Sequence, residues 1–223
     1  MSNWLAETLA VFAKDWKSEA RNLYALNTLA LFAITTLVLV SVGLGPMGVD
    51  AAGAQVLPFL LWIVLLFATS AGLPRAFVQE EETHTATALR LAARPSAVFW
   101  GKLAFSLSLT WGLEILVAPL FLAMVQLDVA APGQFIAALA AGGFGLAAAS
   151  TVIAAIIAQA RGRSTLFAVL SFPILIPLLL LVVELTRDAV GGFDSGAVLR
   201  QLLLYDGTVA VAGAMLFPAI WNP

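Results

Sequence analysis

Cysteine is absent from this chain of 223 residues, and charged residues make up only 11% of it. Without cysteine, the chain holds no disulfide, iron–sulfur cluster, thiolate metal site or cysteine nucleophile. A soluble domain has about 25% charged residues, so a water-soluble fold of this length could not cover its surface. The hydrophobic fraction of 61% predicts a polytopic membrane protein instead.

A nucleotide-binding motif is also lacking. A P-loop needs the pattern G-x-x-x-x-G-K-[ST], in which backbone N–H groups and the lysine hold phosphate. The GK at 101–102 and the GRS at 162–164 do not fit this pattern. If ATP drives this protein, another chain binds it. The first 28 residues also lack the basic region and apolar core of a secretory signal.

Apolar stretches of about 20 residues, the length that crosses a bilayer, recur along the chain. They predict an all-α fold with six transmembrane helices in a single domain over 1–223. The predicted spans are 24–43, 55–73, 98–126, 134–158, 164–186 and 201–220. Before them, apolar residues such as Trp4 and Trp16 at helical spacing predict an amphipathic helix over about 3–21 at the membrane surface. A frayed tail is the alternative.

Lysine and arginine are distributed unevenly among the predicted loops. Nine of the eleven fall before the first span, between the second and third spans, or between the fourth and fifth spans. This count assigns Lys102, at the start of the third span, to the loop between the second and third. Only Arg187 and Arg200 fall on the other side. Because loops rich in lysine and arginine stay in the cytoplasm, both termini are predicted to be cytoplasmic.

A polar segment separates the second and third predicted spans. A helix is predicted over about 80–93, since glutamates at its start and arginines near its end suit the helix dipole. One interpretation is a solvated loop that only joins two spans. The other is a docking helix that a cytosolic protein grips, as in six-span exporters of the ATP-binding-cassette type. The candidate coupling residues are Glu80, Glu81, Glu82, His84, Leu89, Arg90 and Arg94.

Carboxylates and prolines also occur inside the predicted spans. Glu114 lies near the middle of the third, where a charge costs about 2.5–3.5 kcal/mol on insertion scales, so it should face the bundle or a partner subunit. It is interpreted either as a neutral, hydrogen-bonded acid that stabilises the bundle, or as a proton site or a polar contact with a partner helix. Glu184 lies near the outer end of the fifth and is expected to pair with Arg187. The prolines expected to kink their helices are Pro119, Pro173 and Pro177.

Small residues fill the fourth predicted span. Gly142, Gly143 and Gly145 allow close helix contact, and packing within the chain or a dimer seam explains them equally well. The one histidine, His84, is predicted on the cytoplasmic side, where a solvated residue is commoner than an iron ligand. The chain alone is therefore expected to bind no metal and no heme.

Three stretches of this sequence resemble the heme exporter protein B family, and the resemblance covers essentially the full length. They are VQEEE at 78–82, RPSAVFWGK at 94–102 and ARGRSTLFAVLSFPILIP at 160–177. The residues after the acidic run depart from the family, whose members usually have a glycine and a further carboxylate there. In this chain, threonines, an alanine and His84 occupy that region.

The resemblance implies a non-catalytic permease subunit of an ABC-type translocase in the bacterial inner membrane, with a fold similar to ABC-2-type exporters. It implies a cytosolic ATPase subunit that binds ATP, a heme-handling membrane protein, a small single-span subunit, a periplasmic heme chaperone and a second copy of this chain. No nucleic acid is implied. ATP hydrolysis would release the heme-loaded chaperone. A secondary transporter with Glu114 as its proton-coupling site, or a scaffold for the ATPase, are the alternatives.

Overall fold

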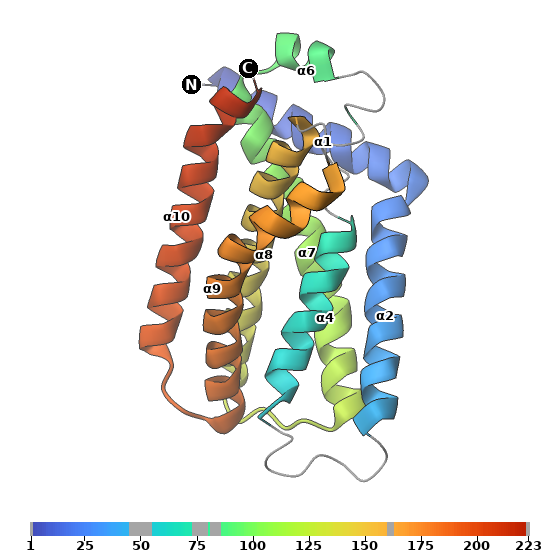
Figure 1. The fold of residues 1–223 in the computed structure, drawn as a ribbon, viewed down its shortest axis with the longest axis vertical. Coiled ribbons are helices and arrows are strands. Elements are labelled where there is room, and N and C mark those ends of the chain that lie inside the picture. Colours follow the sequence, from blue (N-terminus) through green and yellow to red (C-terminus); the bar gives the residue numbers. More distant parts are fainter. Residues whose placement is uncertain (1, 45–54, 73–79, 81–85, 160–162, 222–223) are drawn as a thin grey trace.

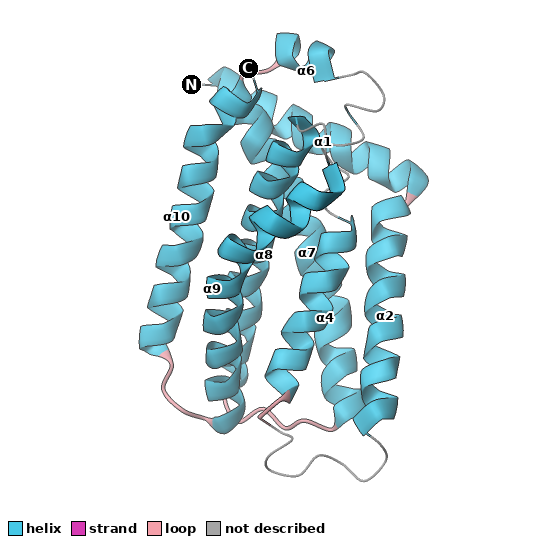
Figure 2. Ribbon diagram, in the orientation of Figure 1, coloured by secondary structure: helices cyan, strands magenta, loops and turns pink. Residues whose placement is uncertain are grey.

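Helices account for all the regular structure in the part of the chain that is described, and loops join them (Figure 2). The computed structural model describes residues 2–44, 55–72, 80, 86–159 and 163–221. The all-α fold is thereby confirmed for these residues. The helices are α1 (Ser2–Asn22), α2 (Tyr24–Leu44), α4 (Leu57–Gly72), α6 (Ala86–Ala92), α7 (Pro95–Val125), α8 (Pro132–Gln159), α9 (Arg163–Gly191) and α10 (Gly196–Trp221).

The long apolar helices run side by side as a bundle, and α1 lies across one end of it (Figure 1). The helix α6 and both ends of the chain lie at this end, which we call the α1 end. Within the bundle, α8 packs against α4, α7, α9 and α10. The surface helix α1 packs mainly against α7.

Four helices of the described part are long and apolar enough to cross a membrane. A shorter apolar helix covers Leu57–Ala71, and α9, at 29 residues, covers the fifth predicted span without being one of the four. The helices thus support a multi-pass membrane protein. The four segments are Leu26–Gly43, Pro95–Val125, Pro132–Ile157 and Gly196–Trp221.

A sharp corner at Leu23 separates α1 from α2. Leu23 has a φ of 47°, a left-handed conformation that residues other than glycine rarely adopt. Its N–H still donates to the carbonyl of Glu19 at 2.6 Å. The Glu19 side chain then accepts the N–H of Leu26 at 2.9 Å, which satisfies one of the free donors in the first turn of α2. The corner turns the chain from the surface helix into the bundle.

Prolines lie inside three of the bundle helices, α7, α9 and α10, without interrupting them. Pro119 lies within α7, and Pro173 and Pro177 lie within α9. Figure 1 shows α9 changing direction between its first turns and its straight second half. Prolines remove a backbone hydrogen bond and are the usual cause of such bends. In α9 they therefore shape the helix rather than break it.

Of the four candidate spans, α8 is the most buried, with 83% of its apolar window inside the protein. Three of its glycines lie so close to a neighbouring side chain that an added Cβ would stand 2.1–2.6 Å from it. These glycines therefore serve packing within the chain, the first of the two interpretations above. The close pairs are Gly142 with Trp62 of α4, Gly143 with Glu114 of α7, and Gly145 with Asp206 of α10.

Candidate functional site

Four charged side chains meet where α1 crosses α7, and we call them the charge cluster: Lys14 and Asp15 of α1, Glu80, and Lys102 of α7. Lys102 Nζ donates to Glu80 Oε1 at 2.9 Å and to Asp15 Oδ2 at 3.2 Å. Lys14 Nζ pairs with the same Glu80 oxygen and lies 3.1 Å from Asp15 Oδ1. Two ammonium groups and two carboxylates thus link α1, Glu80 and α7.

Most of the charge cluster is withdrawn from water. Lys102 is fully buried and Glu80 is 5% exposed, whereas 47% of the Lys14 side chain is exposed. A buried ion costs several kcal/mol unless opposite charges compensate it, so Lys102 depends on both carboxylates. Burial by itself lowers the pKa of Lys14, but the charges of Asp15 and Glu80 outweigh burial and raise that pKa above its ordinary value. Lys14 is therefore charged at neutral pH.

A glycine lets α1 lie directly on α7. A Cβ added to Gly101 would stand 2.8 Å from Val11 Cβ and 2.9 Å from the carbonyl oxygen of Thr8, closer than real Cβ atoms approach. Because residue 101 has no side chain, the two helices touch at this point. The next residue, Lys102, then reaches the turn of α1 that carries Lys14 and Asp15.

The short helix α6 also lies at the α1 end, where it and the residues that follow it contact α10 and α1. The guanidinium of Arg90 lies over the Trp221 ring, 5.1 Å from its centroid, a cation–π contact. Leu89 packs against the hydrophobic cluster that contains Trp221. Beyond α6, the backbone N–H of Arg94 donates to Glu7 Oε2 at 3.1 Å, and Arg94 Nε lies 3.7 Å from Glu7 Oε1. These contacts hold α6 against the ends of two other helices.

The candidate coupling residues do not share one surface. Glu80 lies inside the charge cluster and not on an outer face. Arg94 is exposed, while Leu89 and Arg90 are partly buried near the end of α10. The helix predicted over 80–93 appears as the seven residues of α6, with Glu80 also helical. The other candidates, Glu81, Glu82 and His84, lie outside the residues that the structure describes.

Two further carboxylates lie inside the bundle, both against α8. Glu114 of α7 is 3% exposed and Asp206 of α10 is 1% exposed. Within the described ranges, no group forms a hydrogen bond with Glu114 Oε1 or with either carboxylate oxygen of Asp206. Glu114 therefore faces the bundle, as the cost of a charge at this depth requires. The hydrogen bond expected for a stabilised acid is not made by Oε1.

Asp206 is a buried residue that the sequence reasoning missed. Its signal is visible in LLLYDGTVAVA at 202–212, where one carboxylate interrupts an apolar run. The preceding residue, Tyr205, donates its hydroxyl to the carbonyl of Ile174 at 2.6 Å, between the two prolines of α9. This hydrogen bond joins α10 to the part of α9 that contains the prolines.

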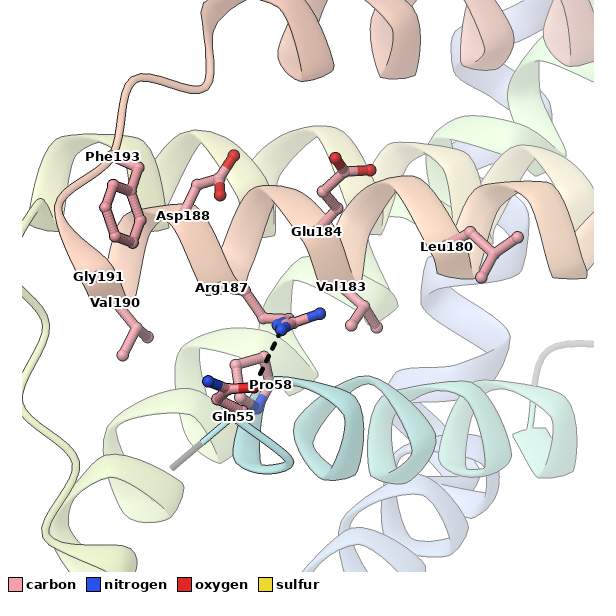
Figure 3. A pocket seen from close by; sticks show the side chains of 10 residues that line it. All are labelled: Gln55, Pro58, Leu180, Val183, Glu184, Arg187, Asp188, Val190, Gly191 and Phe193. Carbon is pink, nitrogen blue, oxygen red and sulfur yellow. Dashed lines mark hydrogen bonds between the residues drawn. The ribbon is translucent and has the colours of Figure 1, made fainter. Parts of the chain in front are cut away.

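At the end opposite α1, a groove of about 730 Å³ lies between the start of α4 and the end of α9 (Figure 3). Arg187 points across it and donates to Gln55 Oε1 at 3.3 Å. The exposed Glu184 points away from Arg187, and the described residues show no ion pair between them. The predicted Glu184–Arg187 pair is therefore wrong, because the guanidinium reaches an amide on α4 instead.

A comparison with known protein families identifies the family of this chain. Residues 6–219 match the family model described as CcmB protein, a range that contains the whole charge cluster. The chain belongs to the CcmB family. CcmB is the heme exporter protein B family, as the three quoted stretches suggested. A search of curated proteins found no match for the chain.

Membership makes this chain a membrane component of the heme exporter of cytochrome c maturation, and a permease subunit. Its described residues contain no group of three or more His, Cys, Asp or Glu that could hold a metal ion. The features that CcmB membership leaves to be explained are the charge cluster at the α1 end and the two carboxylates against α8.

Proposed function

We propose that this chain is the permease subunit of an ATP-driven heme exporter in the bacterial inner membrane. In this proposal α2, α4, α7, α8, α9 and α10 all cross the bilayer, as one domain of the ABC-2 exporter type. The α1 end and both termini face the cytoplasm, as the uneven distribution of lysine and arginine favours. The common position of α1, α6 and both chain ends in Figure 1 supports this orientation.

The partner set follows from the family and from what this sequence lacks. A cytosolic ATPase binds ATP, since this chain has no P-loop. Heme is handled together with a second membrane protein, a small single-span subunit and a periplasmic chaperone, and this chain alone binds no cofactor. Two copies of the chain meet an ATPase dimer. ATP hydrolysis then drives heme delivery or release of the loaded chaperone.

The charge cluster is the observation that supports a role in coupling ATP hydrolysis to movement of the membrane helices. Glu80 belongs to the polar segment, and its carboxylate binds Lys102 inside α7 and Lys14 of α1 at once. A movement of the polar segment, imposed by a bound ATPase, would therefore move α1 and α7 together. On α6, the Leu91 side chain is 87% exposed and offers an apolar contact to an ATPase at the same end.

Single-cysteine variants test both docking and orientation, because the chain has no cysteine of its own. Leu91→Cys and Phe193→Cys place exposed thiols at opposite ends, at positions that are 87% and 67% exposed. In native membranes, a thiol-reactive crosslinker should join Leu91→Cys to a P-loop protein, and Phe193→Cys should give no such adduct. In inside-out vesicles, an impermeant maleimide should modify only Leu91→Cys. The reverse labelling pattern, or equal adducts from both positions, would contradict the proposal.

Deletion of residues 80–93 gives a second test. It should abolish ATPase association while the chain still inserts into the membrane, because the docking element and Glu80 are lost together. Leu91→Glu is the milder partner variant, which removes the exposed apolar contact and leaves the charge cluster intact. Undiminished ATPase binding by the deletion would refute docking through this segment.

The burial of Glu114 favours one other candidate, a secondary transporter that uses Glu114 as its proton-coupling site. Such a transporter needs no ATPase. Glu114→Gln should then abolish covalent heme attachment to cytochrome c, and substitutions at 80–82 should be mild. The exporter proposal predicts the reverse order of severity. A scaffold would retain heme attachment in both kinds of variant as long as the ATPase stays bound.

A further inference from the structure

We propose that Asp206 is a proton-binding site inside the bundle. It holds a proton while α10 packs against α8, and it releases the proton when the two helices separate. The inference does not depend on a partner ATPase. It rests on the surroundings of one side chain, which differ from those of every carboxylate in the charge cluster.

The recess around Asp206 is formed by a missing side chain. Asp206 Oδ1 lies 2.3 Å from the point where a Cβ of Gly145 would stand, so the carboxyl group rests on the bare backbone of α8. Leu178 Cδ1 of α9 lies 2.5 Å from that same point. The side chain is 1% exposed, and neither oxygen has a hydrogen-bond partner among the residues described. The acid is therefore enclosed by apolar groups and glycine.

Among the side chains that the structure describes, the helices that pack against α10 bring no cation to this recess. Residues 132–159 of α8 include no titratable side chain at all. On α9, Arg187 is exposed, lies nine residues beyond Leu178 and binds Gln55. On α7, Lys102 is engaged by Glu80 and Asp15 of the charge cluster.

Two polar residues on the same helix as Asp206, Tyr205 and Arg200, have partners elsewhere. On α10 itself, Tyr205 gives its hydroxyl to α9, and Arg200 Nε donates to the carbonyl of Gly196 at 3.2 Å. Glu114 of α7 is a second acid, and it lies against a different glycine of α8, Gly143. A second carboxylate cannot neutralise the first. A proton is the ligand that neutralises an enclosed carboxylate with no cation nearby.

The same geometry links the proton to helix contact. The recess exists only while α10 lies on α8, because Gly145 forms its floor. Separation of the helices admits water to the carboxyl group, which then ionises as an ordinary aspartate does. A conformational cycle that opens this contact would therefore take up and release one proton at each copy of the chain.

Thermal unfolding as a function of pH tests the proposal in purified, detergent-solubilised protein. The native state keeps a proton that the unfolded chain loses above the ordinary pKa of aspartate, so native stability falls as pH rises. Asp206→Asn lacks this proton linkage. The difference between its Tm and that of the wild type should therefore grow in favour of the variant by about 3–5 °C per pH unit between about pH 5 and pH 7. Glu184→Gln, which removes an exposed carboxylate, should run parallel to the wild type.

Parallel curves for Asp206→Asn and the wild type would overturn the proposal. Infrared spectroscopy provides a readout that does not require the Asn variant to fold. In a detergent without carbonyl groups, Glu114→Gln should keep a protonated-carboxyl band at neutral pH that shifts in deuterium oxide. Loss of all such absorption in Glu114→Gln would mean that Asp206 is ionised. Neither measurement contains an ATPase, so a failure here is separate from a failure of the proposed function.

Discussion

Replacing Lys102 by methionine removes the most deeply buried cation of the charge cluster. The carboxylates of Asp15 and Glu80 are then left with the single ammonium group of Lys14. Methionine has a similar volume to the lysine stem, so the change removes charge with little change in packing. The variant therefore tests whether the cluster holds α1 on α7.

The expected cost follows from burial. Lys102 is fully buried and the Glu80 side chain is 7% exposed, and removing one partner of such a pair costs about 3–5 kcal/mol. Lys14 binds the same Glu80 oxygen and retains part of the compensation. We therefore expect a loss at the lower end, about 3 kcal/mol. This loss corresponds to a roughly 100-fold larger population in which α1 is detached from α7.

Thiol labelling measures this detachment directly. Val11 is 3% exposed and lies against Gly101 of α7, so a cysteine at position 11 becomes reactive only when α1 lifts. In the Val11→Cys background, Lys102→Met should raise the maleimide reaction rate by roughly 100-fold in detergent. Lys17→Met, at an exposed lysine of the same helix, should leave the rate unchanged.

A compensating variant makes the reasoning refutable. Adding Glu80→Met to Lys102→Met leaves only the Lys14–Asp15 pair, with its 3.1 Å separation and balanced charge. Most of the lost protection should return, since no unpaired carboxylate remains. If Lys102→Met changes the labelling rate by less than about twofold, the cluster does not hold α1. If the double variant is no better than the single one, charge imbalance is not the cause.

Three further predictions concern the bundle and its edge. Gly143→Ala places a Cβ 2.6 Å from the Glu114 oxygens and should cost about 1–3 kcal/mol in unfolding assays, whereas Gly112→Ala, where nothing lies within 4 Å, should cost nothing measurable. Tyr205→Phe removes one hydrogen bond to α9 and should lower stability by about 1 kcal/mol. The pKa of Lys14 is raised in the folded protein, so the charged Lys14 contributes its full share to native stability below the ordinary value of 10.5. That share is lost as pH rises beyond it. In Lys14→Gln, Tm should therefore fall less steeply with pH in the alkaline range than in the wild type.

The helical ranges follow closely from apolar run length. The range 24–43 appears as Tyr24–Leu44 and the range 134–158 as Pro132–Gln159, because a bilayer-length apolar run has no stable backbone arrangement other than a helix or closed barrel. The amphipathic helix over 3–21 appears as Ser2–Asn22. The end of α9 and the start of α10 were the least predictable ends of the long helices. Polar residues beyond 186 continue α9 to Gly191, and α10 begins at Gly196 instead of 201.

The candidate site was predicted only in part. Glu80 was selected for its charge and its place between two spans, but its position inside the charge cluster could not be foreseen. That position depends on how α1 crosses α7, which Gly101 permits and no periodicity reveals. Arg187 was predicted to pair with Glu184, three residues before it, yet it binds Gln55, a residue 132 positions away in the sequence. Local spacing shows which residues can meet along one helix and says nothing about what a neighbouring helix offers.

Composition, run length and motifs by themselves determined that this is a helical membrane protein with no cysteine and no P-loop motif, because these are properties of the chain in any conformation. The tertiary structure alone decided which charges meet. Lys102 and Asp15 are 87 residues apart and pair because two helices cross at a glycine. Asp206 lies enclosed because another glycine leaves a recess in α8. Such contacts depend on the close approach of helix backbones, which no single segment of the sequence encodes.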